Sequence, residues 1–351
     1  MYTRKRFSAR DMFLWTLKDT LKFLAIISIW VSAYYFLDLS WLKIPWTPLA
    51  LIGSAVAFVI GFQNNSAYGR IWEARKIWGG IVNTSRTLGM FAQDMISNDH
   101  AITPKDASEL KKEVKVLTYR HIAWMAALRH AMRSPKPWET TVNEAHDEKW
   151  QLPLPEKVIS LEEAMKPYLS ESDLKSVMEK DNKQTALLYQ QSHHLKRLKD
   201  EGTLWEFSFL KMEGVLEELF TLQGKSERIK NFPYPRQFAS LNHYFMWILI
   251  LLLPIAIVPQ FMEIGDTLKL TYPILSEVFM WFSVPIYVIV SWVFHTMERI
   301  GRYGENPFEG TANDVPISTI ARGIEIDLRQ NLGESKDEIP AQHPEHYNIQ
   351  L

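Results

Sequence analysis

The sequence predicts an all-α membrane protein, with four transmembrane helices and a cytosolic helical bundle. Three observations lead to this fold class. Apolar stretches suited to membrane helices occur before residue 97 and again after residue 235. Between them, residues 97–235 are rich in mixed charges and carry apolar residues at helical spacing. No stretch shows the apolar–polar alternation that is typical of strands.

Composition excludes several other classes of protein. The 351 residues include no cysteine, which rules out disulfides and thiolate metal sites. The formal net charge of −1 argues against a nucleic-acid partner, because such proteins usually carry a basic excess. The sequence shows no nucleotide-binding loop, nucleophile elbow or catalytic constellation. We therefore expect neither an enzyme nor a cofactor.

The N-terminal region, residues 1–96, is predicted to hold a membrane-surface segment and two membrane helices. Residues 2–22 combine basic and apolar side chains, which is typical of a segment at a membrane surface. Residues 23–39 form an apolar helix with aromatic residues toward its far end. After a proline-marked turn on the outer side, the second helix covers residues 48–78.

The second helix carries the pattern on which the functional prediction depends. Its purely apolar part, residues 49–62, is too short to cross a hydrocarbon core of about 30 Å. It continues into amides and charges, which would be costly if they faced lipid. Ser54, Phe58 and Phe62 recur at i, i+4 and i+8 and form one stripe. We interpret this stripe as the lining of a pore; the alternative is ordinary helix–helix packing.

The rest of the chain completes the predicted domain order. Residues 97–235 form the cytosolic bundle, and residues 236–296 form the third and fourth membrane helices. Residues 297–335 form a cytosolic C-terminal segment, and residues 336–351 form a disordered tail. Basic residues lie mainly on the side of the termini, so the positive-inside rule predicts a multi-pass membrane protein with cytoplasmic termini.

Three motifs of the chain resemble the bacterial branch of the bestrophin family. Residues 61–79 are GFQNNSAYGRIWEARKIWG, which matches the pattern G-F-x-N-N-x-x-Y-x-R-x-W-E-A-R-x-x-W-G. Residues 229–235 are IKNFPYP. Residues 305–308 are ENPF, with Asn313 and Asp314 shortly after. Together the matches extend over nearly the whole chain.

The resemblance implies a bestrophin-like channel, a homopentamer in a lipid bilayer that passes small inorganic ions through a central pore. It also implies a location in the bacterial inner membrane. It places Ser54, Phe58 and Phe62 in a hydrophobic neck, where rings of apolar side chains can gate by dewetting. Ser54 departs from the apolar residue usual in the family. At the cytosolic aperture it places Ile229, or Lys230 if the register differs by one residue. The choice between an anion such as chloride and a monovalent cation stays open.

The other motif residues are expected to have structural roles. These residues are Asn64, Asn65, Arg70, Trp72, Glu73, Arg75, Asn306, Pro307 and Phe308. Arg70, Glu73 and Arg75 can form an ion-pair network with Asp94 below the pore, or simply a solvated charged face. In animal relatives a run of Asp near the C-terminus binds calcium, but residues 310–312 interrupt that run here. Because calcium prefers about six to eight oxygen ligands, we expect no metal site.

A second function remains open from the sequence. The chain can be a membrane-anchored scaffold or sensor, whose cytosolic bundle binds a partner and whose membrane helices form no pore. The amides after Phe62 favour the channel, because a simple anchor needs no polar groups there.

Overall fold

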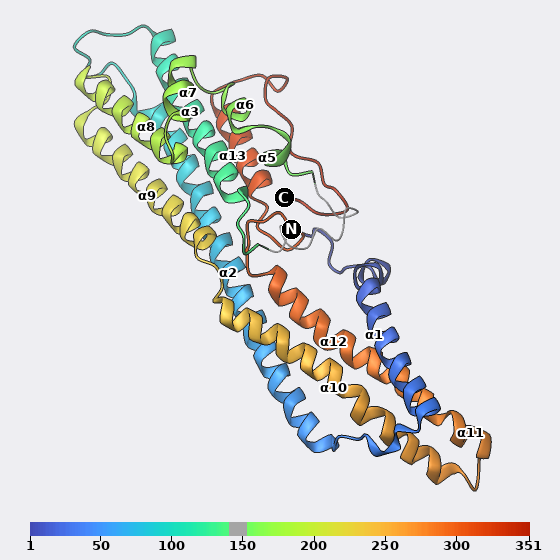
Figure 1. The fold of residues 1–351 in the computed structure, drawn as a ribbon. Coiled ribbons are helices and arrows are strands. Elements are labelled where there is room, and N and C mark those ends of the chain that lie inside the picture. Colours follow the sequence, from blue (N-terminus) through green and yellow to red (C-terminus); the bar gives the residue numbers. More distant parts are fainter. Residues whose placement is uncertain (140–152) are drawn as a thin grey trace. The chain divides into compact units, whose positions relative to one another are not determined.

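The computed structural model describes residues 1–139 and 153–351, and helices dominate them (Figure 1). The described residues contain isolated β-bridges but no strand, which confirms the predicted all-α class. The chain divides into two compact units. Unit 1 comprises residues 1–3, 70–233 and 306–351, and unit 2 comprises residues 4–69 and 234–305.

Four helical segments among the described residues are long and apolar enough to cross a membrane, as predicted. They are α1 (Ala9–Leu37), α2 (Trp46–Met95), α10 (Arg236–Leu268) and the segment Pro273–Tyr303. The sequence predicts one continuous helix for the last of these, but the structure divides it. It consists of α11 (Pro273–Val278), the 3-10 turn η3 (Phe279–Phe282) and α12 (Ser283–Tyr303). A short 3-10 turn, η1 (Leu39–Trp41), follows α1.

The helix α2 is longer than the sequence predicts. It has 50 residues and continues past Trp78, through a pair of glycines that resembles a helix stop. The second glycine serves close packing instead. A Cβ added to Gly80 would lie 2.9 Å from Cδ2 of Leu222, so the glycine gives this side chain of α9 (Glu206–Asn231) room to pack closely. The first part of α2 belongs to unit 2 and the second part to unit 1.

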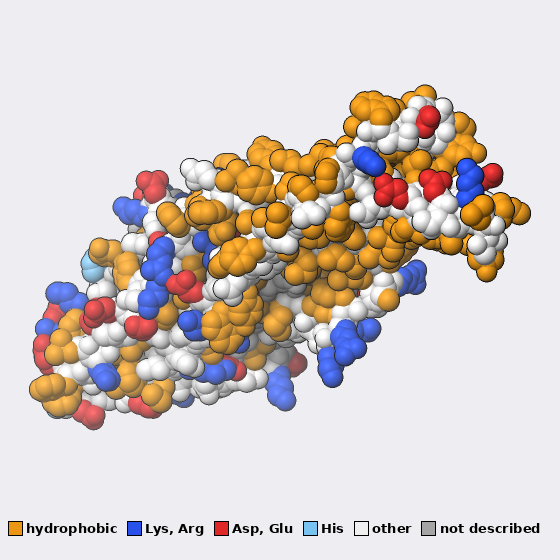
Figure 2. All heavy atoms as spheres, turned by 90° about the horizontal axis from the view of Figure 1, so that it is seen from below, with side chains coloured by type: hydrophobic (Ala, Val, Ile, Leu, Met, Phe, Trp, Pro, Cys, Tyr) orange, Lys and Arg blue, Asp and Glu red, His pale blue; other side chains and the backbone are white. Residues whose placement is uncertain are grey.

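In unit 2, the helix α10 packs against α1, α11, η3 and α12, and α1 packs along α12 (Figure 1). Half of the apolar window of α10 is buried, compared with 22% in each of the other three spans. The Tyr287 hydroxyl donates a hydrogen bond to the Ile250 carbonyl (3.0 Å) and joins α12 to α10. Figure 2 shows a broad surface of hydrophobic side chains, as expected for helices that face lipid.

Unit 1 is a helical bundle around α3, joined by the second part of α2. Its helices are α3 (Ala107–Arg133), α5 (Pro155–Val158), α6 (Leu161–Met165), α7 (Glu171–Met178), α8 (Lys183–Asp200), α9 (Glu206–Asn231) and α13 (Ile317–Asn331). The helix α3 packs against α5, α6, α8, α9 and α13, and α8 runs beside α9 (Figure 1). Ser160 and Glu163 form the capping box of α6. Trp78 and Trp124 are among the largest side chains in the core.

The C-terminal tail, residues 336–351, is folded onto unit 1, although its composition predicts disorder. Ile349 pairs with Tyr2 in an antiparallel bridge. The Leu351 carbonyl accepts hydrogen bonds from the Thr319 backbone N–H (2.8 Å) and hydroxyl (2.9 Å), at the start of α13. Ile349 and Leu351 are also buried. Two apolar side chains and a few backbone hydrogen bonds therefore anchor a segment that is otherwise polar.

A partly buried charge network joins α3 to α8 in unit 1. Nε2 of His194 lies 2.7 Å from Oε2 of Glu113, and its Nδ1 lies 2.9 Å from Nη1 of Arg120. Because a guanidinium only donates, Nδ1 accepts and Nε2 donates, so the imidazole is neutral. Burial and the charges of Arg120 and Arg197 lower the pKa of His194 to about 4. Burial opposes ionisation of Glu113, but hydrogen bonds from Arg197, Lys105 and His194 outweigh it and lower its pKa to about 2.

Acidification should destabilise unit 1 in two steps. The unfolded chain protonates His194 near pH 6.5, while the folded chain resists protonation until about pH 4. The corresponding stability, about 3 kcal/mol, is full above pH 6.5 and is lost as the pH falls through 4. The contribution of Glu113 is full above pH 4.5 and is lost as the pH falls through about 2. We expect His194→Gln to reduce the first step in melting curves recorded at successive pH values, while other buried histidines such as His121, whose pKa burial lowers to about 3, keep their own share of it. His193→Gln, at the exposed neighbouring position, should retain it; equal slopes in the two variants would contradict the assignment.

Candidate functional site

Ser54, Phe58 and Phe62 lie on one face of α2 in unit 2, and their own chain does not bury them. Phe58 is 66% exposed and Phe62 is 56% exposed. Their rings contact each other edge to face, with centroids 4.5 Å apart. The Ser54 hydroxyl donates to the Ala50 carbonyl (2.9 Å), so it is satisfied within the helix. Packing in the core of a single chain therefore does not account for this stripe.

A different face of α2 packs against unit 2. Leu49, Val56, Ile60 and Gln63 are almost fully buried along this face. The three apolar residues belong to the same hydrophobic core as residues of α1, α10 and α12. Large apolar side chains on the remaining faces, such as Leu51 at 68% exposure, need lipid or another protein copy as cover.

The first amide after the stripe is buried in a tertiary network instead of facing a water-filled path. Gln63 is 1% exposed. Its Oε1 accepts a hydrogen bond from Nδ2 of Asn242 (3.0 Å), and its Nε2 donates to Oε1 of Glu305 (3.0 Å). The other oxygen of Glu305 accepts from Nη2 of Arg236 (2.9 Å). This chain of contacts joins α2, α10 and the segment after α12.

The next motif residue, Asn64, also has a structural role. Its Nδ2 donates to the carbonyls of Ile60 and Met297, each at 3.1 Å, and so connects α2 to α12. A Cβ added to Gly301 would lie 2.9 Å from Oδ1 of Asn64, so glycine at this position leaves room for the amide between α2 and α12. Asn65 lies on an exposed face. Neighbouring amides of one motif thus face different surroundings.

Arg70 holds the C-terminal end of α9 in unit 1. Its Nη2 donates to the carbonyls of Ile229 and Phe232, each at 3.0 Å. These carbonyls lie where the helix leaves its acceptors unpaired and where its dipole favours a cation. The arginine of the motif is therefore a helix-capping residue.

In the predicted charge network, Glu73 pairs with a residue from outside the predicted set. Nη2 of Arg228 pairs with Oε1 of Glu73 at 2.5 Å. Within the described part of the chain, Arg75 and Asp94 are exposed and take part in no ion pair. Trp72 is 53% exposed. A partly solvated charged face agrees better with this arrangement than a closed network.

The two candidates for the cytosolic aperture lie in the interior of unit 1. Ile229 and Lys230 are each 5% exposed. Ile229 belongs to the hydrophobic core, and the Lys230 ammonium pairs with the buried carboxylate of Glu139. The exposed side chains at this end of α9 include Arg228, Asn231 and, just after the helix, Phe232. Helical spacing explains why Ile229 is buried, because it follows the buried Leu222 by two turns on the same face of α9.

The Asn306–Phe308 motif packs into unit 1. Phe308 is 1% exposed and lies against Trp78, with ring centroids 6.4 Å apart. The Pro307 carbonyl accepts a hydrogen bond from the Val315 backbone N–H (3.2 Å). Asn306 is also buried. These contacts agree with the structural role expected for the motif.

In the acidic loop after this motif, the buried carboxylate already accepts hydrogen bonds from groups of the same chain. The Asp314 carboxylate accepts from the backbone N–H groups of Gly310 (2.6 Å) and Thr311 (3.0 Å), and from the Thr311 hydroxyl (2.5 Å). Burial raises the pKa of Asp314, against the charge of Arg133 and these hydrogen bonds. Residues 1–139 and 153–351 contain no cluster of three or more His, Asp or Glu residues arranged to hold a metal ion.

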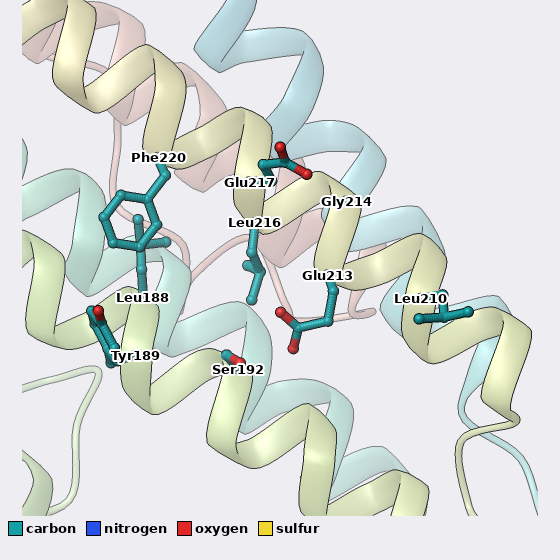
Figure 3. Close-up of a pocket in the computed structure, with 9 residues that line it drawn as sticks. All are labelled: Leu188, Tyr189, Ser192, Leu210, Glu213, Gly214, Leu216, Glu217 and Phe220. Carbon is teal, nitrogen blue, oxygen red and sulfur yellow. The ribbon is translucent and has the colours of Figure 1, made fainter.

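A groove of about 550 Å³ lies between α8 and α9 in unit 1 (Figure 3). Its wall combines apolar side chains such as Leu188 and Phe220 with the carboxylates of Glu213 and Glu217. None of the residues that the sequence singles out lines it, so we assign it no part in the site.

Comparisons with known proteins agree with the motifs. A family model described as Bacterial/Fungal Bestrophin protein matches residues 4–330. The chain is 26% identical over 300 residues to the voltage-dependent anion channel-forming protein YneE of Escherichia coli K12, covering 86% of this chain and 80% of the relative. It is 27% identical over 288 residues to the voltage-dependent anion channel-forming protein RSc3414 of Ralstonia nicotianae, covering 82% and 78%. A crystal structure of a bacterial bestrophin homologue from Klebsiella pneumoniae has a TM-score of 0.68 at 20% identity, covering 93% of this chain and 99% of that one.

Proposed function

We propose a function for this chain from the premise that it belongs to the bacterial and fungal bestrophin family. The chain is an ion channel of a membrane. Several copies surround a central pore, and the stripe of Ser54, Phe58 and Phe62 on α2 forms its hydrophobic neck. The observation that carries this proposal is the exposure of Phe58 and Phe62 in the single chain. Aromatic side chains that no residue of their own chain covers suit a ring formed by several copies.

The neck favours neither sign of charge by its own side chains, because its three residues are uncharged. The names of the relatives support an anion as the permeant ion. We therefore propose that the chain passes small inorganic anions. Its location would be the bacterial inner membrane, with both termini in the cytoplasm, as the distribution of Lys and Arg favours.

For the cytosolic exit we propose the C-terminal end of α9. The family resemblance favours Ile229 as the residue that lines this exit, or Lys230 if the register differs by one residue. Both are buried in the single chain, so either would reach the path only after the helix end rearranges. The exposed Arg228 at the same helix end is paired with Glu73, so this ion pair gives the exit no preference for either sign of charge.

Flux through reconstituted protein tests the proposed function. Purified full-length protein in a planar bilayer should carry current when a potassium chloride gradient is applied. The reversal potential should lie near the equilibrium potential of chloride, because the proposed pore selects anions. Current that reverses near the potassium potential would overturn the selectivity. Absence of current would favour the alternative, a membrane-anchored scaffold or sensor.

We expect a closed ring of five copies. Only one stripe of the first part of α2 is buried in its own chain, so its other faces need protein or lipid as cover. Identical subunits around a central pore usually assemble with closed cyclic symmetry. Native mass spectrometry of detergent-purified protein should show a pentamer as the main species. A monomer or dimer would contradict the pore arrangement.

Gly61 offers a sharper version of the same experiment. An added Cβ at Gly61 meets no atom of its own chain within 4 Å, so Gly61→Leu should leave the single chain intact. If neighbouring copies approach closely at this glycine, the variant should reduce the pentamer fraction at unchanged helix content. The matched control is Gly214→Leu on α9, where an added Cβ is equally free of contacts.

A further inference from the structure

The face of α2 that carries the proposed neck stays exposed beyond the neck. Trp46–Met95 is one continuous α-helix, in which each residue advances by about 100° around the axis. The three neck residues share a sector about 80° wide. Between positions 54 and 76 this sector holds Ser54, Phe58, Phe62, Asn65, Gly69, Trp72 and Lys76. All of these residues are exposed in the single chain, so the face that we assign to the pore continues as far as Lys76.

Lys76 is the only charged residue of this sector between positions 54 and 76. Its side chain is exposed, and its ammonium group pairs with no carboxylate in the described part of the chain. Glu73 lies beside the sector, but it pairs with Arg228 at 2.5 Å. Arg75 is exposed too, but it lies about 100° around the helix from Lys76. This stretch of the pore face therefore carries a single positive charge that no neighbouring group neutralises.

The other residues assigned to the pore do not distinguish an anion from a cation. The neck is uncharged. At the proposed exit, Arg228 is paired with Glu73, and Lys230 is buried in a pair with Glu139. The ammonium group of Lys76 differs from these groups because it is both solvated and unpaired. Rings of lysine or arginine side chains are a known means of selecting anions in pores.

We propose that Lys76 determines the anion selectivity of the channel, an inference that rests on the proposed function. One ammonium group from each copy would form a ring that concentrates anions and repels cations. Lys76 follows Phe62 by 14 residues, or about 21 Å along a helix. This spacing exceeds the Debye length of about 8 Å in physiological salt, so the ring acts on ions outside the neck and leaves the apolar gate unchanged.

Reversal potentials in a potassium chloride gradient test this role, with full-length protein in a planar bilayer. Lys76→Glu should lower the chloride-to-potassium permeability ratio about tenfold or more, because the ring then repels the anion. Lys76→Gln should give an intermediate ratio, and Lys76→Arg should keep the wild-type ratio. The matched control is Arg75→Glu, which makes the same change of charge one residue away but outside the sector, and should leave the ratio nearly unchanged. Equal shifts in Lys76→Glu and Arg75→Glu would overturn the proposal, because they would reflect surface charge in general.

A cysteine at the same position tests the charge in channels that have already assembled. The chain has no cysteine, so Lys76→Cys introduces its only thiol. Modification with the trimethylammonioethyl methanethiosulfonate should restore the wild-type permeability ratio, and the sulfonatoethyl reagent should lower it below that of the unmodified variant. Arg75→Cys should respond to neither reagent. A permeability ratio that stays constant although mass spectrometry shows complete modification at position 76 would overturn the proposal, even if Lys76→Glu fails to assemble.

The wild-type recording separates failure of this role from failure of the channel. Absence of wild-type current would overturn the proposed function and the role of Lys76 with it. Wild-type current that prefers potassium would overturn the role of Lys76 and leave the pore. Anion-selective current that ignores the charge at position 76 would do the same.

Discussion

Truncation of Phe58 and Phe62 to alanine in the same chain should raise ion flux severalfold and leave assembly intact. The two rings are 66% and 56% exposed in the single chain and contact each other. If several copies direct them at a common axis, water and ions avoid the gap between the rings and the closed state is favoured by dewetting. Removal of the rings widens the path and removes the apolar surface that repels water. Single-channel recording should show higher open probability or conductance.

The competing interpretation of these aromatics predicts the opposite result. If Phe58 and Phe62 pack between copies, each truncation removes a large buried side chain at a cost of about 3–5 kcal/mol. The oligomer should then melt at a lower temperature and flux should fall. Phe36→Ala is a suitable control, because Phe36 is 76% exposed on α1 and its loss should change neither flux nor melting. Flux and melting of the oligomer must be measured on the same preparation.

Hydrophobic periodicity predicts the number of membrane helices and the helical class of the remainder, because both depend on local patterns. The predicted helix boundaries are less accurate where contacts with other parts of the chain decide where a helix ends. Gly79 and Gly80 resemble a helix stop, yet α2 continues to Met95, and Gly80 lies close to Leu222 of α9. A single sequence cannot distinguish a glycine that ends a helix from a glycine that admits a neighbour.

The candidate site shows the same division between local and tertiary information. The spacing of Ser54, Phe58 and Phe62 is local, and the structure places all three on one exposed face. The aperture depends on which face of α9 is buried, and the structure places Ile229 inside unit 1. The sequence also gives no sign that Gln63 is buried, because its partners lie far away in the chain.

Replacement of Gln63 by methionine should destabilise unit 2 far more than replacement of the exposed amide Asn65. Methionine has a similar length but cannot bond to Nδ2 of Asn242 or Oε1 of Glu305, which lie 3.0 Å from the amide. Both groups would stay buried without this partner. A buried polar group that loses its partner costs about 1–3 kcal/mol, so the two groups together should cost about 2–6 kcal/mol. The melting temperature of the detergent-purified protein should fall by several degrees.

The control for this change is Asn65→Leu, which also replaces an amide by an apolar group of similar size, two residues further along α2. Asn65 is exposed in the single chain, so its replacement should leave the melting of unit 2 nearly unchanged. If Gln63 faced a water-filled path instead, the two variants would have similar small effects on melting, and Gln63→Met would mainly change conductance. A lower melting temperature for Gln63→Met alone therefore assigns this amide to the joint between α2 and α10, and restricts the pore face of α2 to the stripe that contains Phe58 and Phe62.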